Sequence, residues 1–440
     1  MKPASLAPNS RIDLIDALRG SALFGILLLH SIEHWDFTRY PPNPPAWLRA
    51  LNAQTHDLGF FLFGGKAYAI FAMMFGVSFF LILDRWSQRG INFRGRFLWR
   101  LTVLAAFGFL HGIIYTGDIL LVIAVLGLPL VFFYKLGNRA LAWISVALVL
   151  QFPSLWETGR VLFEHGYQFP QSRHWAIYGH LWGVYSNGTF LDVIRTNLWE
   201  GQLARIWWTI ESGRYTQMMG LFVWGLLLGR ARVFEDAARS VRVAKQALLW
   251  GAVGFAILFP IKLHLGGWGL RDMGLYVTDN LVSSYCNIAQ MAVWSGGFVL
   301  LYQRARARAA LNLFAPYGRM SLTCYVTQAL VGVPLFYGYG LALYRYVGPF
   351  FSVLGALAYF AIQCTAAHLW LRRFHYGPLE WLWRAFTFCS FATPMRKTRT
   401  APPAGVEDVA ARVGHHRGSC RVRNDRCEDG IVTGESDPAG

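Results

Sequence analysis

Long apolar stretches alternate with short polar connections over most of this 440-residue chain. Each stretch has about 20 residues, the length of a helix that crosses the hydrocarbon core of a bilayer. The pattern therefore predicts an all-α, polytopic membrane bundle of about ten transmembrane helices. The predicted spans are 14–33, 58–83, 97–115, 118–135, 139–156, 213–230, 246–262, 282–303, 320–340 and 349–371.

Two parts of the chain depart from this pattern. Residues 157–212 join the fifth and sixth spans, and they include an amphipathic, tryptophan-rich stretch. Such a segment predicts interfacial helices on the outer face of the membrane. From residue 396 to residue 440 the chain is rich in Pro, Gly, Arg, Asp and Glu, which predicts a disordered cytosolic tail. We therefore expect a transmembrane domain over 1–395, followed by this tail.

Composition and charge narrow the class of protein. Hydrophobic residues make up 55% of the chain and charged residues only 15%, which excludes an ordinary soluble enzyme. The net charge of +17 is concentrated in every second connection between spans. By the positive-inside rule, these connections and both termini lie in the cytoplasm, and the even number of spans agrees. The positive charge is thus a signal of topology, and we expect no nucleic-acid partner.

The first predicted span carries charged side chains, which are costly in a membrane and usually functional. Asp16 and Arg19 lie near its cytoplasmic end, and His30 lies near its outer end. On a helix, Arg19 and His30 face within ~20° of each other and lie ~16 Å apart. Glu33 and His34 continue the same stripe at helical spacing. The alternative is a snorkelling Arg19 paired with Asp16 and a histidine at the interface.

Further candidates lie in other spans. Lys66 falls inside the second span, where a lysine is unusual. His111 and Asp118 end consecutive spans and are joined by a short turn, so they form either a catalytic pair or a structural hydrogen bond. Arg100 and Arg319 lie at cytoplasmic ends, where a guanidinium can bind phosphate through two hydrogen bonds. Glu380 follows the last span and is expected to pair with Arg384.

Four blocks of this sequence resemble the YeiB-like bacterial inner-membrane proteins, a domain of unknown function numbered 418. The resemblance covers about residues 11–390, with the blocks in the family's order. The blocks begin with Ile15-Asp16-Ala17-Leu18-Arg19-Gly20, Gly65-Lys66-Ala67-Tyr68, Gly108-Phe109-Leu110-His111-Gly112 and Gly318-Arg319-Met320-Ser321. The resemblance implies a multi-pass protein of the bacterial inner membrane.

That family is itself similar to transmembrane acyltransferases, including the acyltransferase-3 enzymes and heparan glucosaminide acetyltransferase. Those enzymes begin with a similar Asp-x-x-Arg-Gly element, and acyltransferase-3 enzymes carry a functional histidine 14 positions after its aspartate. His30 occupies that position in this chain. YeiB-like proteins usually carry asparagine there, so this chain departs from them toward the enzymes.

The resemblance implies transfer of an acyl group from cytosolic acyl-CoA to an acceptor at the outer face, an envelope glycan or a small molecule. Asp16, Arg19, Arg100 and Arg319 would hold the donor. His30, oriented by Glu33, would act as base or acyl carrier, with His111 and Asp118 as a second pair. His34 and Lys66 would contact the acceptor. We expect the bilayer as partner, no tightly bound cofactor and no metal; the oligomeric state stays open, a homo-oligomer included.

Two other functions fit parts of the pattern. A transporter or flippase without chemistry could line a path for an anionic solute with Asp16, Arg19 and Lys66. His30-Ser31-Ile32-Glu33-His34 also spells H-x-x-E-H, the motif of inverted zinc peptidases. A zinc-dependent hydrolase would need a third ligand, and His56 or Asp57 would have to supply it.

Overall fold

The computed structural model describes residues 13–164, 166–270 and 272–397. These residues fold almost entirely into helices, and the one bridge between extended segments joins Phe374 to Arg396. The all-α prediction is therefore confirmed for this part of the chain. The predicted tail lies outside the described residues, apart from its first two positions.

The helices are α1 (Asp13–Ile32), α2 (Ala46–Phe63), α3 (Ala67–Ser87), α4 (Arg94–Ile114), α5 (Leu120–Leu126), α6 (Leu128–Phe133), α7 (Asn138–Val149), α8 (Phe152–Phe163), α9 (Arg173–Asn187), α10 (Phe190–Thr196), α11 (Gln202–Glu211), α12 (Arg214–Arg230), α13 (Ala237–His264), α14 (Asp272–Tyr302), α15 (Ala305–Leu311), α16 (Phe314–Arg319), α17 (Ser321–Phe336), α18 (Pro349–Arg373) and α19 (Pro378–Phe388). A π-helical turn, Asn197–Gly201, joins α10 to α11, and short 3₁₀ turns cover Leu265–Trp268 and Leu343–Arg345.

Every predicted span falls on one or two of these helices, but the structure does not reach ten spans by length. Five helical segments of the described chain are long and apolar enough to cross a membrane, or six if the bent pair α7–α8 counts as one span. Proline explains part of the difference, because it cannot donate the helical backbone hydrogen bond. Pro129 is the second residue of α6, which follows α5 directly, and Pro334 lies near the end of the short α17. The apolar helices suggest a membrane protein.

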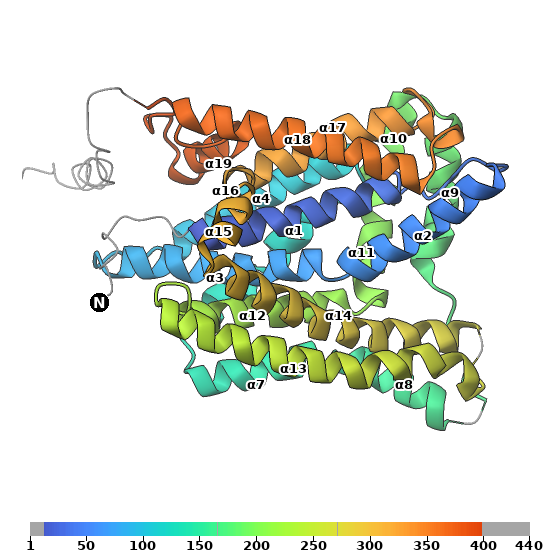
Figure 1. The fold of residues 1–440 in the computed structure, drawn as a ribbon, viewed down its shortest axis with the longest axis horizontal. Helices are drawn as coiled ribbons and strands as arrows, with labels where there is room; N and C mark the ends of the chain where they lie inside the picture. The colour runs from blue at the N-terminus through green and yellow to red at the C-terminus, as the bar shows by residue number, and fades with distance from the viewer. Residues whose placement is uncertain (1–12, 165, 271, 398–440) are drawn as a thin grey trace, which may run out of the picture. The chain divides into compact units, whose positions relative to one another are not determined.

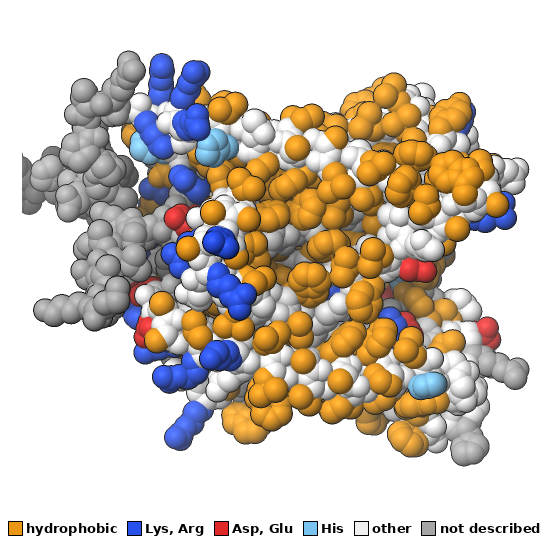
Figure 2. All heavy atoms as spheres, in the orientation of Figure 1, with side chains coloured by type: hydrophobic (Ala, Val, Ile, Leu, Met, Phe, Trp, Pro, Cys, Tyr) orange, Lys and Arg blue, Asp and Glu red, His pale blue; other side chains and the backbone are white. Residues whose placement is uncertain are grey.

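Helix α1 lies at the centre of the bundle and contacts α2, α3, α16, α17 and α18 (Figure 1). Most of its apolar side chains are buried. Helix α13 is the opposite case, because Leu249, Trp250 and Ile257 are largely exposed, as expected of a surface that faces lipid. Figure 2 shows apolar side chains over the middle of one face, with Lys and Arg gathered at the end that carries α15, α16 and α19.

A glycine contact between α1 and α16 places the charged end of α1. A Cβ added to Gly20 would lie 2.1 Å from the carbonyl oxygen of Phe314. A Cβ added to Gly318 would lie 1.9 Å from the carbonyl oxygen of Asp16. Only hydrogen fits at both positions, so the two backbones touch and Arg319 is brought beside Arg19.

Replacing Gly318 with valine should destabilise the fold strongly. The new side chain would have to push the backbone of α1 away, and we expect a loss of ~3 kcal/mol or more in the free energy of unfolding. Thermal unfolding of the purified protein in detergent measures this. Gly355→Val on α18 is the control, because nothing lies within 4 Å of its added Cβ. Equal stability of the two variants would contradict the close contact.

Candidate functional site

The structure contains two cavities that line up along α1. One, of about 220 Å³, lies at the C-terminal end of α1, and we call it the histidine cavity. The other, of about 280 Å³, lies near its N-terminal end, and we call it the arginine cavity. The ionisable residues that line the histidine cavity are His30, Glu33, Asp36, Asp118, Arg205 and Arg214. The charged residues that line the arginine cavity are Arg19, Arg100, Arg319, Glu380 and Arg384.

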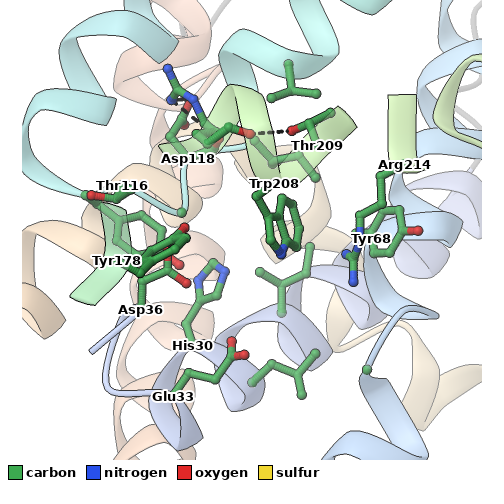
Figure 3. Close-up of a pocket in the computed structure, with 18 of the residues that line it drawn as sticks. His30, Glu33, Asp36, Tyr68, Thr116, Asp118, Tyr178, Trp208, Thr209 and Arg214 are labelled. Carbon is green, nitrogen blue, oxygen red and sulfur yellow. Dashed lines mark hydrogen bonds and ion pairs between the residues drawn. The ribbon is translucent and has the colours of Figure 1, made fainter. Parts of the chain in front are cut away.

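His30 projects from the last turn of α1 into the histidine cavity (Figure 3). Its ring lies against Tyr115 and Tyr325, with ring centroids 5.1 Å and 6.0 Å away. The imidazole therefore has two aromatic walls and one side open to the cavity. A ligand in the cavity can reach it.

A left-handed turn follows α1 and brings a carboxylate back to this cavity. His34, Trp35 and Asp36 have φ angles of 49°, 57° and 66°. Each such residue costs about 1–2 kcal/mol when it is not glycine. Buried contacts hold the turn, since the Trp35 amide donates to His30 at 2.7 Å and the Tyr337 hydroxyl donates to Trp35 at 2.9 Å. The turn places Asp36 in the lining beside His30.

The predicted stripe ends at Glu33, because the helix ends at Ile32 and His34 turns away. The buried His34 ring stacks on Phe336, with centroids 4.2 Å apart. Its Nε2 bonds to the Ser352 hydroxyl and its Nδ1 to the Arg39 carbonyl oxygen, both at 2.9 Å. His34 is thus part of the packing around the turn and does not line the cavity.

The same geometry separates the residues of the H-x-x-E-H motif. His30 faces the cavity, whereas both ring nitrogens of His34 are engaged elsewhere. His56 and Asp57 contact each other on the exposed side of α2, at 3.2 Å. Among residues 13–164, 166–270 and 272–397, no group of three His, Cys, Asp or Glu side chains is arranged to hold a metal ion. The arrangement predicted for a zinc hydrolase is therefore not assembled.

His111 and Asp118 form a buried, hydrogen-bonded pair across the turn between α4 and α5. His111 Nδ1 lies 2.8 Å from Asp118 Oδ1, and Arg205 Nη1 lies 3.2 Å from Asp118 Oδ2. Arg205 comes from α11, within the segment predicted to lie on the membrane surface. Sequence reasoning missed it, and the only available signal was an arginine among the apolar residues of an amphipathic stretch. Asp118 and Arg205 line the cavity, whereas His111 stands behind Tyr325.

Two carboxylates of the histidine cavity follow the end of α1, outside the candidate span. Burial raises the pKa of Glu33 to about 8, the charge of Asp36 raises it further, and Arg214 opposes the shift. Burial also raises the pKa of Asp36 to about 6, against the hydrogen bond from the Tyr178 hydroxyl and the charge of Arg214. Burial therefore disfavours the charged form of both carboxyl groups, and a cationic group beside them would favour it again.

Replacing Glu33 with glutamine should stabilise the protein more as the pH rises. Folding raises the pKa of Glu33 from 4.5 to about 8, so the folded state binds the proton more tightly and stability falls as pH rises through this range. Glutamine does not titrate, so the variant does not lose stability in this way as the pH rises. We expect the melting temperature of the variant to exceed that of the wild type by several degrees at about pH 9, and far less at about pH 5. Exposed Glu164→Gln is the control, and parallel wild-type and Glu33→Gln profiles would contradict the expectation.

The arginine cavity gathers the three arginines that the sequence placed at cytoplasmic ends, with Arg384 as a fourth. Arg19 bonds to Asp16 at 3.1 Å and to the Ser78 hydroxyl at 2.7 Å. The Arg100 guanidinium lies 3.5 Å from the centre of the Trp383 ring. These contacts fix the guanidinium groups of Arg19 and Arg100 in place.

Glu380 does not pair with Arg384 as the sequence predicted. Its carboxylate accepts hydrogen bonds from the amides of Leu322 and Thr323, at 2.7 and 3.1 Å, and from the Thr323 hydroxyl at 2.6 Å. These groups form the N-terminus of α17, which attracts negative charge. The carboxylate is thus held by the helix, and Arg384 stacks on Tyr376 and Phe388 instead.

A thin wall separates the two cavities. No residue lines both, but Leu322 lines the arginine cavity and Tyr325, three residues later on α17, lines the histidine cavity. Three residues correspond to about 4.5 Å of helix. Helix α5 shows the same relation, with Ile123 on one side and Val122 on the other. The linings of the two cavities therefore meet on α5 and on α17.

Lys66 lies at the break between α2 and α3, where Gly64 and Gly65 interrupt the predicted second span. Its Nζ donates a hydrogen bond to the Phe60 carbonyl oxygen at 3.1 Å. Both glycines line the histidine cavity, but Lys66 does not. The lysine therefore caps the end of α2 beside the cavity.

Comparisons with known proteins identify relatives. A family model described as a protein of unknown function, DUF418, matches residues 228–390. The uncharacterized protein YxaH of Bacillus subtilis (strain 168) is 28% identical over 431 residues, which is 90% of this chain and 100% of the relative. The uncharacterized protein YeiB of Escherichia coli (strain K12) is 28% identical over 87% of this chain and 98% of its own length. No solved structure matches.

Proposed function

This chain belongs to the YeiB-like DUF418 family, and we propose that it is an integral-membrane acyltransferase of the bacterial inner membrane. It would move an acyl group from cytosolic acyl-CoA to an acceptor at the outer face. One observation carries the proposal: four arginines from different helices line one cavity, and two helices of its wall, α5 and α17, also line a second cavity that holds an imidazole and carboxylates.

The arginine cavity suits the phosphate groups of the donor. A guanidinium binds phosphate through two parallel hydrogen bonds, and a cluster of them neutralises several negative charges. Glu380 adds little repulsion, because the N-terminus of α17 holds its carboxylate. The Lys and Arg side chains at this end of the bundle (Figure 2) favour its placement in the cytoplasm, where acyl-CoA is made.

The histidine cavity would hold the acceptor. As the acceptor's oxygen or nitrogen attacks the thioester carbonyl, His30 takes its proton. The carbon–sulfur bond then breaks, and the leaving thiolate recovers the proton from the imidazolium. The thioester end of the donor must pass the wall between α5 and α17 for this step, and Tyr325 stands at that point.

Binding of acyl-CoA tests the donor site. The full chain in lipid nanodiscs should bind radiolabelled acetyl-CoA or palmitoyl-CoA saturably, and free CoA should compete. The double variant Arg100→Gln, Arg384→Gln should bind about 10²- to 10⁴-fold more weakly, because each of the two charged hydrogen bonds contributes about 1.5–3 kcal/mol. Arg306→Gln is the control, since this exposed arginine of α15 lies outside the cavity lining. Absence of saturable binding to the wild type would reject the proposal.

A transporter of an anionic solute is the second candidate, and the position of the two cavities in series along α1 favours it. A transporter would open each cavity in turn across the wall between them. Proteoliposomes loaded with labelled acyl-CoA separate the two functions. Cleavage of the thioester supports acyl transfer, whereas movement of an intact anion across the bilayer without cleavage supports transport.

A further inference from the structure

Three ionisable side chains that line the histidine cavity have no ion-pair partner among the described residues. Arg214, the first residue of α12, lies over the rings of Tyr68 and Trp208, at 4.7 and 4.3 Å. In the part of the chain that the structure describes, its guanidinium forms no ion pair or hydrogen bond, and neither does the carboxylate of Glu33. The Asp36 carboxylate accepts one hydrogen bond, from the Tyr178 hydroxyl at 3.1 Å.

Asp118 and Arg205 show the contrast within the same cavity. They bond to each other at 3.2 Å, and Asp118 also pairs with His111. Their charges therefore hold the walls together. A charged group that lines an apolar cavity without a partner is costly, so Glu33 and Arg214 are expected to face a ligand.

Arg214 and the two carboxyl groups, Glu33 and Asp36, lie on different sides of the histidine cavity. In Figure 3, Glu33 points into the open space from below, Arg214 enters from the right beside Tyr68, and Asp36 lies to the left with Tyr178. Glu33 and Asp36 both sense the charge of Arg214 without contacting it. A ligand between them would meet negative charge at one end and positive charge at the other.

We propose that the histidine cavity binds a small zwitterion, with its amino group against Glu33 and Asp36 and its anionic group on Arg214. A carboxylate or a phosphate fits the guanidinium equally well through paired hydrogen bonds. The aromatic walls, which include Trp175, Trp182 and Trp208, suit an ammonium group or an apolar body. An amino acid and the phosphoethanolamine group of a lipid are the two sources of this chemistry.

This inference rests on the proposed function only for the role of the ligand. If the acyl transfer takes place, the amino group held near His30 is the acceptor. A carboxylate, Glu33 or Asp36, first takes one proton from the ammonium group. The carbon–nitrogen bond then forms to the acyl carbon, the carbon–sulfur bond breaks, and the second proton passes through His30 to the leaving thiolate. Binding itself requires no acyl donor.

Thermal unfolding of the full chain in a non-ionic detergent, without acyl-CoA, tests the binding. The zwitterionic probes are L-phenylalanine and O-phosphoethanolamine. The probes with a single charge are L-phenylalaninamide and 3-phenylpropionate. We expect at least one zwitterion to raise the melting temperature saturably and to bind at least about 10-fold more tightly than either single-charge probe, because each loses a charge-assisted contact. The zwitterion that binds identifies the source.

Variants assign the two ends of the ligand. Arg214→Gln should weaken zwitterion binding about 10-fold or more and change L-phenylalaninamide binding little. Glu33→Gln should weaken the binding of both the zwitterion and L-phenylalaninamide, because both carry an amino group. Arg173→Gln is a matched control, since Arg173 stacks on Trp207 at 4.3 Å as Arg214 does on Trp208 but does not line the cavity. If Arg214→Gln does not fold, Arg214→Lys, which keeps the charge, should retain partial binding.

Several results would overturn the inference. One is that neither zwitterion binds. Another is that a single-charge probe binds as tightly as the zwitterion. A third is that Arg173→Gln weakens zwitterion binding as much as Arg214→Gln does. The outcome is independent of the proposed function. Binding without thioester cleavage would leave a zwitterion site in a protein that is not an acyltransferase, and acyl transfer to an acceptor without an amino group would reject only the zwitterion.

Discussion

Replacing Arg205 with methionine is expected to lower the free energy of unfolding by about 3–5 kcal/mol, the usual effect of removing one partner from a buried ion pair. Asp118 would keep its hydrogen bonds with His111 and the Leu121 amide, at 2.8 and 3.0 Å, but the Arg205 guanidinium that neutralises its charge would be gone. Thermal unfolding in detergent measures the loss. Arg195→Met on α10 is the control, because this arginine of the same segment is exposed.

A double variant separates the charge from the packing. Asp118→Asn removes the buried negative charge, so adding it to Arg205→Met should recover part of the lost stability, and the interaction between the two substitutions should be large. If Arg205→Met lost only the packing of its side chain, Asp118→Asn would add to the damage. That result would show that Arg205 does not neutralise Asp118.

The dependence on Arg205 also explains why sequence reasoning found only part of this site. His111 and Asp118 are seven residues apart, so a short turn was enough to predict their contact. Arg205 is 87 residues from Asp118 and reaches it only because α11 packs beside the turn. A period of apolar residues predicts that a helix forms, but not which buried charge its one arginine will meet.

The sequence predicted one end of α1 better than the other. The glycine after Arg19 and the charged positions of the span were visible in the sequence, and they mark the end where the arginine cavity forms. The other end depends on three left-handed residues without a glycine, His34, Trp35 and Asp36, which the chain adopts only because distant side chains hold them. No local signal announces such a turn, so the sequence extended the helical stripe to His34 and missed Asp36.

The helices of the described chain do not confirm ten spans by length, for a related reason. Apolar composition is preserved where a helix breaks, as at Pro129 and at Gly64, so a pattern of apolar residues continues across the break. The break after α2 lies at the histidine cavity. Gly64 lines the histidine cavity, and Lys66 caps the end of α2 beside it.

Replacing His30 with glutamine is expected to reduce acyl transfer by about 10²- to 10⁴-fold, the usual contribution of a general base. Glutamine keeps the size and polarity of the side chain, so the walls formed by Tyr115 and Tyr325 should stay in place. Release of free CoA from acetyl-CoA or palmitoyl-CoA, with the acylated acceptor detected by mass spectrometry, measures the rate. Binding of the donor should be unchanged, because His30 does not line the arginine cavity.

The comparison with His111 decides which imidazole does the chemistry. His111→Gln breaks the pair with Asp118 and should lower stability, but His111 does not line the cavity, so the surviving folded protein should still transfer the acyl group faster than His30→Gln. His56→Gln, on the exposed side of α2, should match the wild type in both measurements. The opposite result is full activity of His30→Gln together with loss of activity in folded His111→Gln. It would show that His111, in the buried pair with Asp118, is the general base. Tyr115 and Tyr325, which contact His111, would then stand between this base and the acceptor.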